Sequence, residues 1–211
     1  MCAAERLYAA HGLDGVSLRH IATAVGNGNN SVVQYHFGSR DGLIEAIFQY
    51  RLPRLNERRM LLVAERPPDD VRSWVECQLR ALLEQSELDG SHYLGFVEVL
   101  YQHGRRDLFD LVPTECREDI ARFHQRLSAL LGHIEETLRT HRIARAMALI
   151  VHAAADRERA RANGQPVLPF AVELNGLVDG MVGFLEAPVS PLARATLDQV
   201  GGAGVRWPMF L

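Results

Sequence analysis

A short stretch near the amino terminus is crowded with side chains that hydrogen-bond nucleic-acid bases and phosphates. Asn and Gln amides can pair with adenine through two hydrogen bonds, while Ser, Tyr and His suit the sugar-phosphate backbone. One arginine precedes this stretch and another follows it. The candidate DNA-binding residues are Arg19, Asn29, Asn30, Ser31, Gln34, Tyr35, His36 and Arg40. A polar helix with a solvated face explains the same composition, and this alternative stays open on the residue types alone.

The 9 histidines raise the question of metal binding or catalysis, and their spacing argues against both. The zinc-protease motif needs two histidines one helical turn apart, and no two histidines here are separated by three residues. A di-iron bundle needs Glu three residues before His, and the closest approach is Asp89 before His92. There is no Cys-x-x-Cys, no Gly-x-Ser-x-Gly and no phosphate-binding glycine loop. A triad can still assemble from distant residues, but we expect no enzyme, no metal and no cofactor.

Short helices must position the candidate DNA-binding residues. Ser17 is a good N-cap for a helix with Leu18, Ile21, Ala22 and Val25 on one apolar face, and Gly26 is suited to end it. The pattern predicts helices over Glu5–His11, from Leu18 to the Gly26 turn, over Ser31–His36, and from a cap at Asp41 to about Glu65 with a kink at Pro53. This order of elements, a helix, a capped helix, a tight turn and a short polar helix, is the arrangement of a helix-turn-helix.

The rest of the chain also has helical periodicity, without sustained strand-like alternation. We expect further helices over about Asp69–Leu88, His92–His103, Thr114–Leu131, Glu135–Ala162 and Phe170–Glu186, and a frayed tail from Ala187 to Leu211. The prediction is an all-α fold of about nine helices and no sheet. It divides into a helix-turn-helix domain over residues 1–48 and a helical body over residues 49–211.

Length, composition and charge fit this organisation. The 211 residues are 47% hydrophobic and 23% charged, which excludes a disordered chain, a collagen and a disulfide scaffold. Residues 1–59 hold seven Arg against five acids, whereas the remainder holds sixteen Arg against twenty-one acids. A mildly basic amino-terminal part on an acidic body suits a nucleic-acid-binding module, although a difference in net charge of this size also arises by chance. Three scattered cysteines, no secretory signal and no apolar stretch of about 20 residues favour a cytoplasmic protein without a membrane span.

The stretch from Ala3 to Tyr50 resembles the DNA-binding region of the TetR family of transcriptional regulators. The matching run is AAERLYAAHGLDGVSLRHIATAVGNGNNSVVQYHFGSRDGLIEAI. Gly12, Ser17 and Gly26 fit the family pattern, and Tyr35-His36-Phe37, followed by Arg40 and Leu43, is among its most specific marks. The resemblance implies a homodimer whose paired recognition helices read a palindromic operator. It also implies an all-helical body that dimerises and binds a small-molecule inducer.

Two features depart from the family pattern. Family members usually carry a basic arm before the first helix, and here about four residues precede it, so we expect fewer contacts from such an arm. Gly28 and Asn29 are poor helix formers at the start of the expected recognition helix. The helix should therefore begin near Asn30, which shifts the base-reading set by a residue or two.

The body offers candidates for a dimer interface and for a ligand pocket. Three glycines in the last long helix, Gly176, Gly180 and Gly183, suggest a close helix approach. The predicted interface residues are Ile143, Met147, Ile150, Leu174, Leu177, Val178, Met181 and Leu185. The predicted pocket residues are Trp74, Phe96, Leu100, Tyr101, Phe123 and Leu127. Ordinary packing within the chain's own core explains both sets as well, and the absence of a charge cluster favours an apolar or amphipathic effector.

The leading hypothesis is a repressor that binds double-stranded DNA as a dimer and is released by a small molecule. A modest coupling free energy, about 1–3 kcal/mol, between two body conformations is enough for such release. The alternative is a helical ligand-binding or scaffold protein of the same fold that has lost DNA binding. An all-helical enzyme is a third hypothesis, for which the sequence contains no motif.

Overall fold

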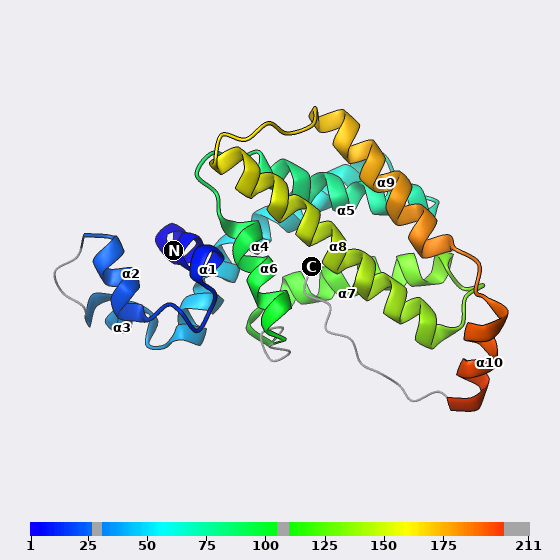
Figure 1. Ribbon diagram of the computed structural model, residues 1–211, viewed down its shortest axis with the longest axis horizontal. Coiled ribbons are helices and arrows are strands. Elements are labelled where there is room, and N and C mark those ends of the chain that lie inside the picture. The colour runs from blue at the N-terminus through cyan, green and yellow to red at the C-terminus, as the bar shows by residue number, and fades with distance from the viewer. Residues whose placement is uncertain (27–30, 105–109, 201–211) are drawn as a thin grey trace.

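The computed structural model describes residues 1–26, 31–104 and 110–200 of the chain, and within these ranges it contains ten α-helices and no strand. The helices are α1 (Cys2–His11), α2 (Leu18–Ala24), α3 (Ser31–Phe37), α4 (Arg40–Glu65), α5 (Val71–Ser86), α6 (Tyr93–His103), α7 (Thr114–Leu130), α8 (Glu136–Ala162), α9 (Phe170–Glu186) and α10 (Pro191–Val200). Figure 1 shows α2 and α3 at one end of the molecule and α8 and α9 on an outer side of the body. The predicted all-α class is confirmed.

The first turn of α2 forms as its sequence predicts. The Ser17 hydroxyl accepts a hydrogen bond from the His20 amide at 3.2 Å, and the His20 ring accepts from the Ser17 amide at 3.5 Å. At the other end Gly26 has φ of +69°, which an L side chain rarely adopts. Ile21 is buried as expected, but Val25 is 55% exposed. Val25 follows the last residue of α2, so its side chain no longer points along the helix's buried face.

The cap of α4 differs from the prediction. Ser39, rather than Asp41, accepts from the free amide of Gly42 at 3.0 Å, and Asp41 lies in the first helical turn. A carboxylate there still interacts favourably with the helix dipole. The helix then continues to Glu65 through Pro53, which lies on its exposed side. It therefore links the predicted helix-turn-helix domain, residues 1–48 (the head), to the predicted body, residues 49–211, without a break.

Helix α10 was not expected, because the tail was predicted to fray. Two adjacent residues, Ser190 and Pro191, favour the start of a helix at this point. The Ser190 hydroxyl accepts from the Ala193 amide at 3.2 Å, and Pro191 is the first helical residue. Serine before a helix and proline at its first position are both favoured, since proline lacks an amide hydrogen that would otherwise be unpaired. The other helix ends lie within three residues of the predicted ones.

The core is continuous from the helix-turn-helix into the body. Helix α1 packs against α6, and α6 packs in turn against α8. Gly95 permits the first contact, because a Cβ added there would lie only 3.0 Å from the Ala9 Cβ. Tyr8 and Phe96 are fully buried where these helices meet, with ring centroids 5.8 Å apart. The head is therefore packed onto the body as well as covalently linked through α4.

Candidate nucleic-acid interface

Helix α3 presents a polar face to solvent while its other side anchors it. Val33 is buried and Phe37 is partly buried against the core, whereas Gln34, Tyr35 and His36 are exposed. Tyr35 is 87% exposed, with its ring edge to face with the exposed His36 ring at 5.5 Å, and two exposed aromatic rings favour a binding role for this surface. The predicted contacts Asn29 and Asn30, together with the side chain of Ser31, lie outside the described residues.

The two predicted arginines differ in their surroundings. Arg19 is exposed on α2 and forms no ion pair with the residues that the structure describes. Arg40 is half-buried, where Nη1 lies 3.3 Å from Asp14 Oδ1 and Nη2 donates to the Val16 carbonyl at 3.4 Å. Arg40 therefore ties the start of α4 to the loop before α2, a role that the sequence pattern did not indicate. Arg19 is the less constrained of the two cations for binding a phosphate.

A buried ion pair that sequence reasoning missed joins the head to α4. The Glu5 carboxylate is fully buried and accepts from Arg51 Nε at 2.8 Å and from Nη2 at 2.6 Å. The guanidinium also lies 5.8 Å from the ring centroid of Tyr93 on α6. Arg51 thus contacts residues of α1 and α6 from α4. The two charged residues are 46 positions apart in sequence, so no local pattern could pair them.

Asp14 makes a second connection between head and body. Its carboxylate interacts with His103 Nε2 at 2.9 Å, at the end of α6, and with Arg40 at the start of α4. The His103 ring and, less strongly, the Arg40 guanidinium lower the pKa of Asp14. Because this site is exposed, it holds the loop before α2 in place more than it adds stability.

The structure corrects the predicted dimer interface at the level of individual residues. Six of the eight predicted side chains are at most 3% exposed within a single chain: Ile143, Met147, Ile150, Leu174, Val178 and Leu185. Leu177 and Met181 are partly buried against the same core. A side chain without exposed surface has none to lose to a second copy, so these stripes hold α8 and α9 onto α5 and α6.

The outer face of α9 is instead an apolar surface that the single chain leaves exposed. Val172 is 57% exposed and Phe184 is 36% exposed. Gly176 and Gly180 lie between them at intervals of four residues, so all four share one face of the helix. A Cβ added at either glycine would meet no atom within 4 Å. The close approach that these glycines allow is therefore not made by any residue that the structure describes.

The six predicted pocket residues do not surround any one hollow described in the structure. Phe96 stacks with Tyr8, Phe48 and Tyr93, at centroid distances of 5.8–6.4 Å, near the head. Trp74 and Phe123 meet edge to face at 5.0 Å between α5 and α7. Leu100 and Leu127 are buried, and Tyr101 is partly buried. None of the six residues lines a hollow that the structure describes, and a single pocket formed by all six stays a prediction.

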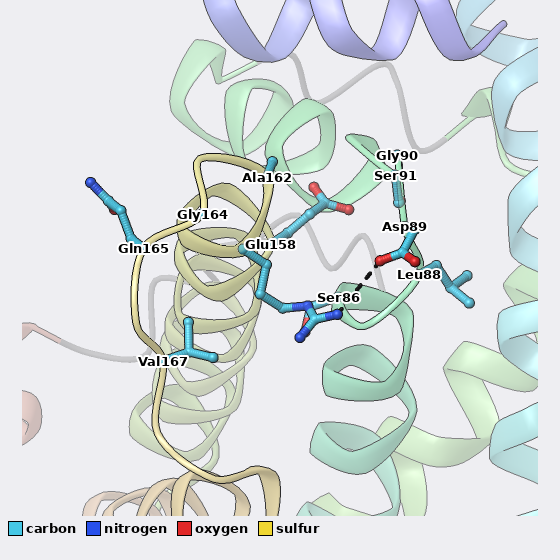
Figure 2. A pocket seen from close by; sticks show the side chains of 11 residues that line it. Ser86, Leu88, Asp89, Gly90, Ser91, Glu158, Ala162, Gly164, Gln165 and Val167 are labelled. Carbon is cyan, nitrogen blue, oxygen red and sulfur yellow. Dashed lines mark ion pairs between the residues drawn. The ribbon is translucent and has the colours of Figure 1, made fainter.

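Four hollows described in the structure are lined by other residues. Figure 2 shows one of about 280 Å³ beside the loop that follows α5, where Arg161 pairs with Asp89 at 3.7 Å and the buried Glu158 comes from α8. A second, of about 220 Å³, is lined by residues of α1, α6 and α8, among them Arg6, Gly95 and Arg159. Neither holds a metal-ligand set, and the described residues contain no group of three or more His, Cys, Asp or Glu that could bind a metal ion.

Three polar side chains are buried between α4, α5 and α7. Arg59 is 2% exposed, Gln78 is 1% exposed and His124 is 4% exposed. Both polar atoms of the Gln78 amide and both ring nitrogens of His124 lack a hydrogen-bond partner, as do Nε and Nη1 of Arg59. Buried polar atoms are normally paired, so this cluster requires an explanation.

Acidification should destabilise the fold through His124. Burial and the nearby Arg59 charge lower its pKa from 6.5 to about 4. Since the neutral ring is favoured in the folded state, its contribution is complete above pH 6.5 and is lost as the pH falls towards 4. We expect a loss of about 3 kcal/mol across that range. Urea unfolding at several pH values should give a flatter pH profile for His124→Gln, whereas His133→Gln, at an exposed position, should behave like wild type.

Comparison with known proteins supports the assignment of the head. Residues 1–47 match the family model described as "Bacterial regulatory proteins, tetR family". A search of curated proteins found no match to the chain. Among the described residues, no helix is long and apolar enough to cross a membrane.

Proposed function

Because the chain belongs to the tetR family of bacterial regulatory proteins and is a DNA-binding transcriptional regulator, we propose that it acts as a homodimeric repressor. Each copy reads one half-site of a palindromic operator, and a small apolar or amphipathic effector releases the dimer from DNA. Residues 1–48 form the DNA-binding domain, and residues 49–211 form the domain for effector binding and dimerisation.

The observation that carries the proposal is the exposed polar face of an anchored α3. In this proposal Gln34 and Asn30 read base edges, while Tyr35 and His36 contact the phosphate backbone. Arg19 supplies a further phosphate contact from α2, and Arg40 adds another beside its interaction with Asp14. Asn29 and Ser31 complete the proposed set of DNA contacts. Val33 and Phe37 hold this face in a fixed orientation, which base recognition requires.

Replacing Gln34 and Arg19 separately should distinguish base reading from backbone contact. We expect Gln34→Ala to weaken binding to the preferred operator by about 10- to 100-fold and to relax sequence preference at one position. We expect Arg19→Ala to weaken binding to all sequences alike and to reduce the slope of log K against log salt by about one. Gel-shift titrations on the region upstream of the gene, at several salt concentrations, measure both effects.

Arg72→Ala serves as a matched control, because Arg72 is an exposed arginine that pairs with Asp179 in the body. It should leave operator affinity and salt slope unchanged. Identical patterns for the Gln34 and Arg19 variants would contradict the division of roles. Absence of any DNA binding by wild type at low salt would favour the alternative, a helical ligand-binding or scaffold protein that has lost DNA binding.

The connections between head and body support a ligand response. Arg51 joins α1, α4 and α6, and His103 at the end of α6 interacts with Asp14 in the loop before α2. A change in the position of α6 or α4 relative to the body would therefore move the helix-turn-helix as a unit. A differential affinity of about 1–3 kcal/mol for the two arrangements suffices to change the spacing of two heads on DNA.

A further inference from the structure

We infer that the buried polar cluster of Arg59, Gln78 and His124 binds an amphipathic carboxylate. Arg59 pairs with the carboxylate group, and the aromatic side chains of Trp74 and Phe123 pack against the apolar part. This assignment rests on the proposed function, since it names the chemical class of the effector. It narrows the apolar or amphipathic effector that the sequence favoured to an amphipathic carboxylate, because a single buried arginine, rather than a cluster of charges, selects the ligand.

The charge on Arg59 is the first step of the argument. Burial lowers its pKa only to about 10, so the guanidinium carries its proton at neutral pH. Asp119 is near enough to oppose this shift but forms no ion pair with Arg59. The Asp119 carboxylate instead accepts hydrogen bonds from Asn56 and Arg122. A buried cation without a counter-ion is costly, and an anion at this position would gain a charge-assisted hydrogen bond.

Water alone explains only part of the cluster. Buried water molecules could satisfy the His124 ring and the Gln78 amide, because both groups are neutral and need only donors and acceptors. Water would leave the positive charge of Arg59 uncompensated. A carboxylate supplies the missing counter-charge and an acceptor for one of the unpaired atoms Nε and Nη1 of Arg59, since its two oxygens match one edge of a guanidinium, either Nε with Nη2 or Nη1 with Nη2.

Neighbouring side chains favour a ligand with an apolar part. The Arg59 guanidinium carbon lies 5.6 Å from the ring centroid of Phe123, which meets Trp74 edge to face. Gln78 lies one turn beyond Trp74 on α5, and His124 follows Phe123 on α7. A cation, two aromatic rings and two neutral polar groups are thus contributed by three mutually packed helices. A hollow of about 260 Å³ also lies between α4 and α5, lined in part by Leu62 and Cys77, which are close in the chain to Arg59 and Gln78.

Matched acids and alcohols test the assignment on the full-length protein without DNA. The probes are butyrate and 1-butanol, octanoate and 1-octanol, and 2-naphthoate and 2-naphthalenemethanol. We expect at least one acid to raise Tm more than its alcohol does, by about 5–10 °C when its concentration is about 100 times Kd. Tryptophan fluorescence in a Trp207→Phe background, in which Trp74 is the remaining tryptophan, should change with the same Kd.

Variants at position 59 identify the cation. Arg59→Met should retain the helical circular dichroism of wild type and lose the preference for acids. Arg59→Lys keeps the charge without the forked geometry, so it should retain the preference with about tenfold weaker binding. Arg58→Met is the matched control, since Arg58 is on the same helix but pairs with Glu84 near the surface. It should bind acids as wild type does.

Two results would overturn the assignment. One is that no acid binds wild type better than its matched alcohol, and the other is that the preference persists in a folded Arg59→Met variant. These measurements do not involve DNA, so they test binding of the acid independently of the proposed release from DNA. Binding of an acid without any change in operator affinity would leave the anion site standing and would contradict the effector role instead.

Discussion

Replacing Glu5 with alanine is expected to lower the melting temperature of the protein by about 10 °C. The variant leaves the guanidinium of Arg51 without the carboxylate that accepts two of its hydrogen bonds. Removing one partner of a buried ion pair costs about 3–5 kcal/mol, and each kcal/mol lowers Tm by about 2–4 °C in a chain of this size. Thermal melts followed by circular dichroism measure the effect.

The matched controls separate the lost ion pair from a simple loss of charge. Glu57→Gln removes a carboxylate from an exposed position on α4 and should change Tm by less than about 2 °C. The double variant Glu5→Leu and Arg51→Met replaces both partners with apolar groups and should recover most of the lost stability. A Glu5→Ala variant as stable as Glu57→Gln would show that the pair does not hold the head to α4 and α6.

Local features of the fold were predictable because neighbouring residues decide them. The N-cap at Ser17 follows from the side chain three positions before an amide that needs an acceptor. The turn at Gly26 follows from a backbone angle that favours glycine. The prediction of Asp41 as the cap of α4 was wrong because Ser39 and Asp41 are both good capping residues, so residue type does not choose between them. The packing of α3 onto α4 fixes where the helix begins.

Long-range features were not predictable from the same patterns. Periodicity identified the apolar stripes of α8 and α9, but it does not say whether a stripe faces its own chain or a second copy. The paired charges of Glu5 and Arg51 are far apart in sequence. The buried Arg59 lies in a stretch of α4 rich in arginine, where nothing local distinguishes it from the partly exposed Arg58. In each case the three-dimensional packing supplies the missing information.

Dimerisation should be abolished by a charged side chain on the outer face of α9. In the proposed dimer this face, with Val172, Gly176, Gly180 and Phe184, packs against its equivalent in the second copy. Gly180→Arg would place two unpaired charges in that contact and would prevent the close approach of the helices. At a cost of about 3–5 kcal/mol, the dimer Kd should rise by roughly 100- to 5,000-fold. Sedimentation velocity should then detect a monomer, and operator affinity should fall with it.

Val178→Arg is the informative comparison, because Val178 lies between Gly176 and Gly180 in sequence but on the opposite side of α9, where it is only 2% exposed within its own chain. An arginine there would disrupt the packing of α9 on α5 and should unfold the chain, as a lower Tm and a loss of helical signal would reveal. Gly180→Arg should leave the monomer folded, since a side chain at Gly180 meets no atom within 4 Å of its Cβ. A folded Gly180→Arg variant that still sediments as a full dimer would place the interface elsewhere on the molecule.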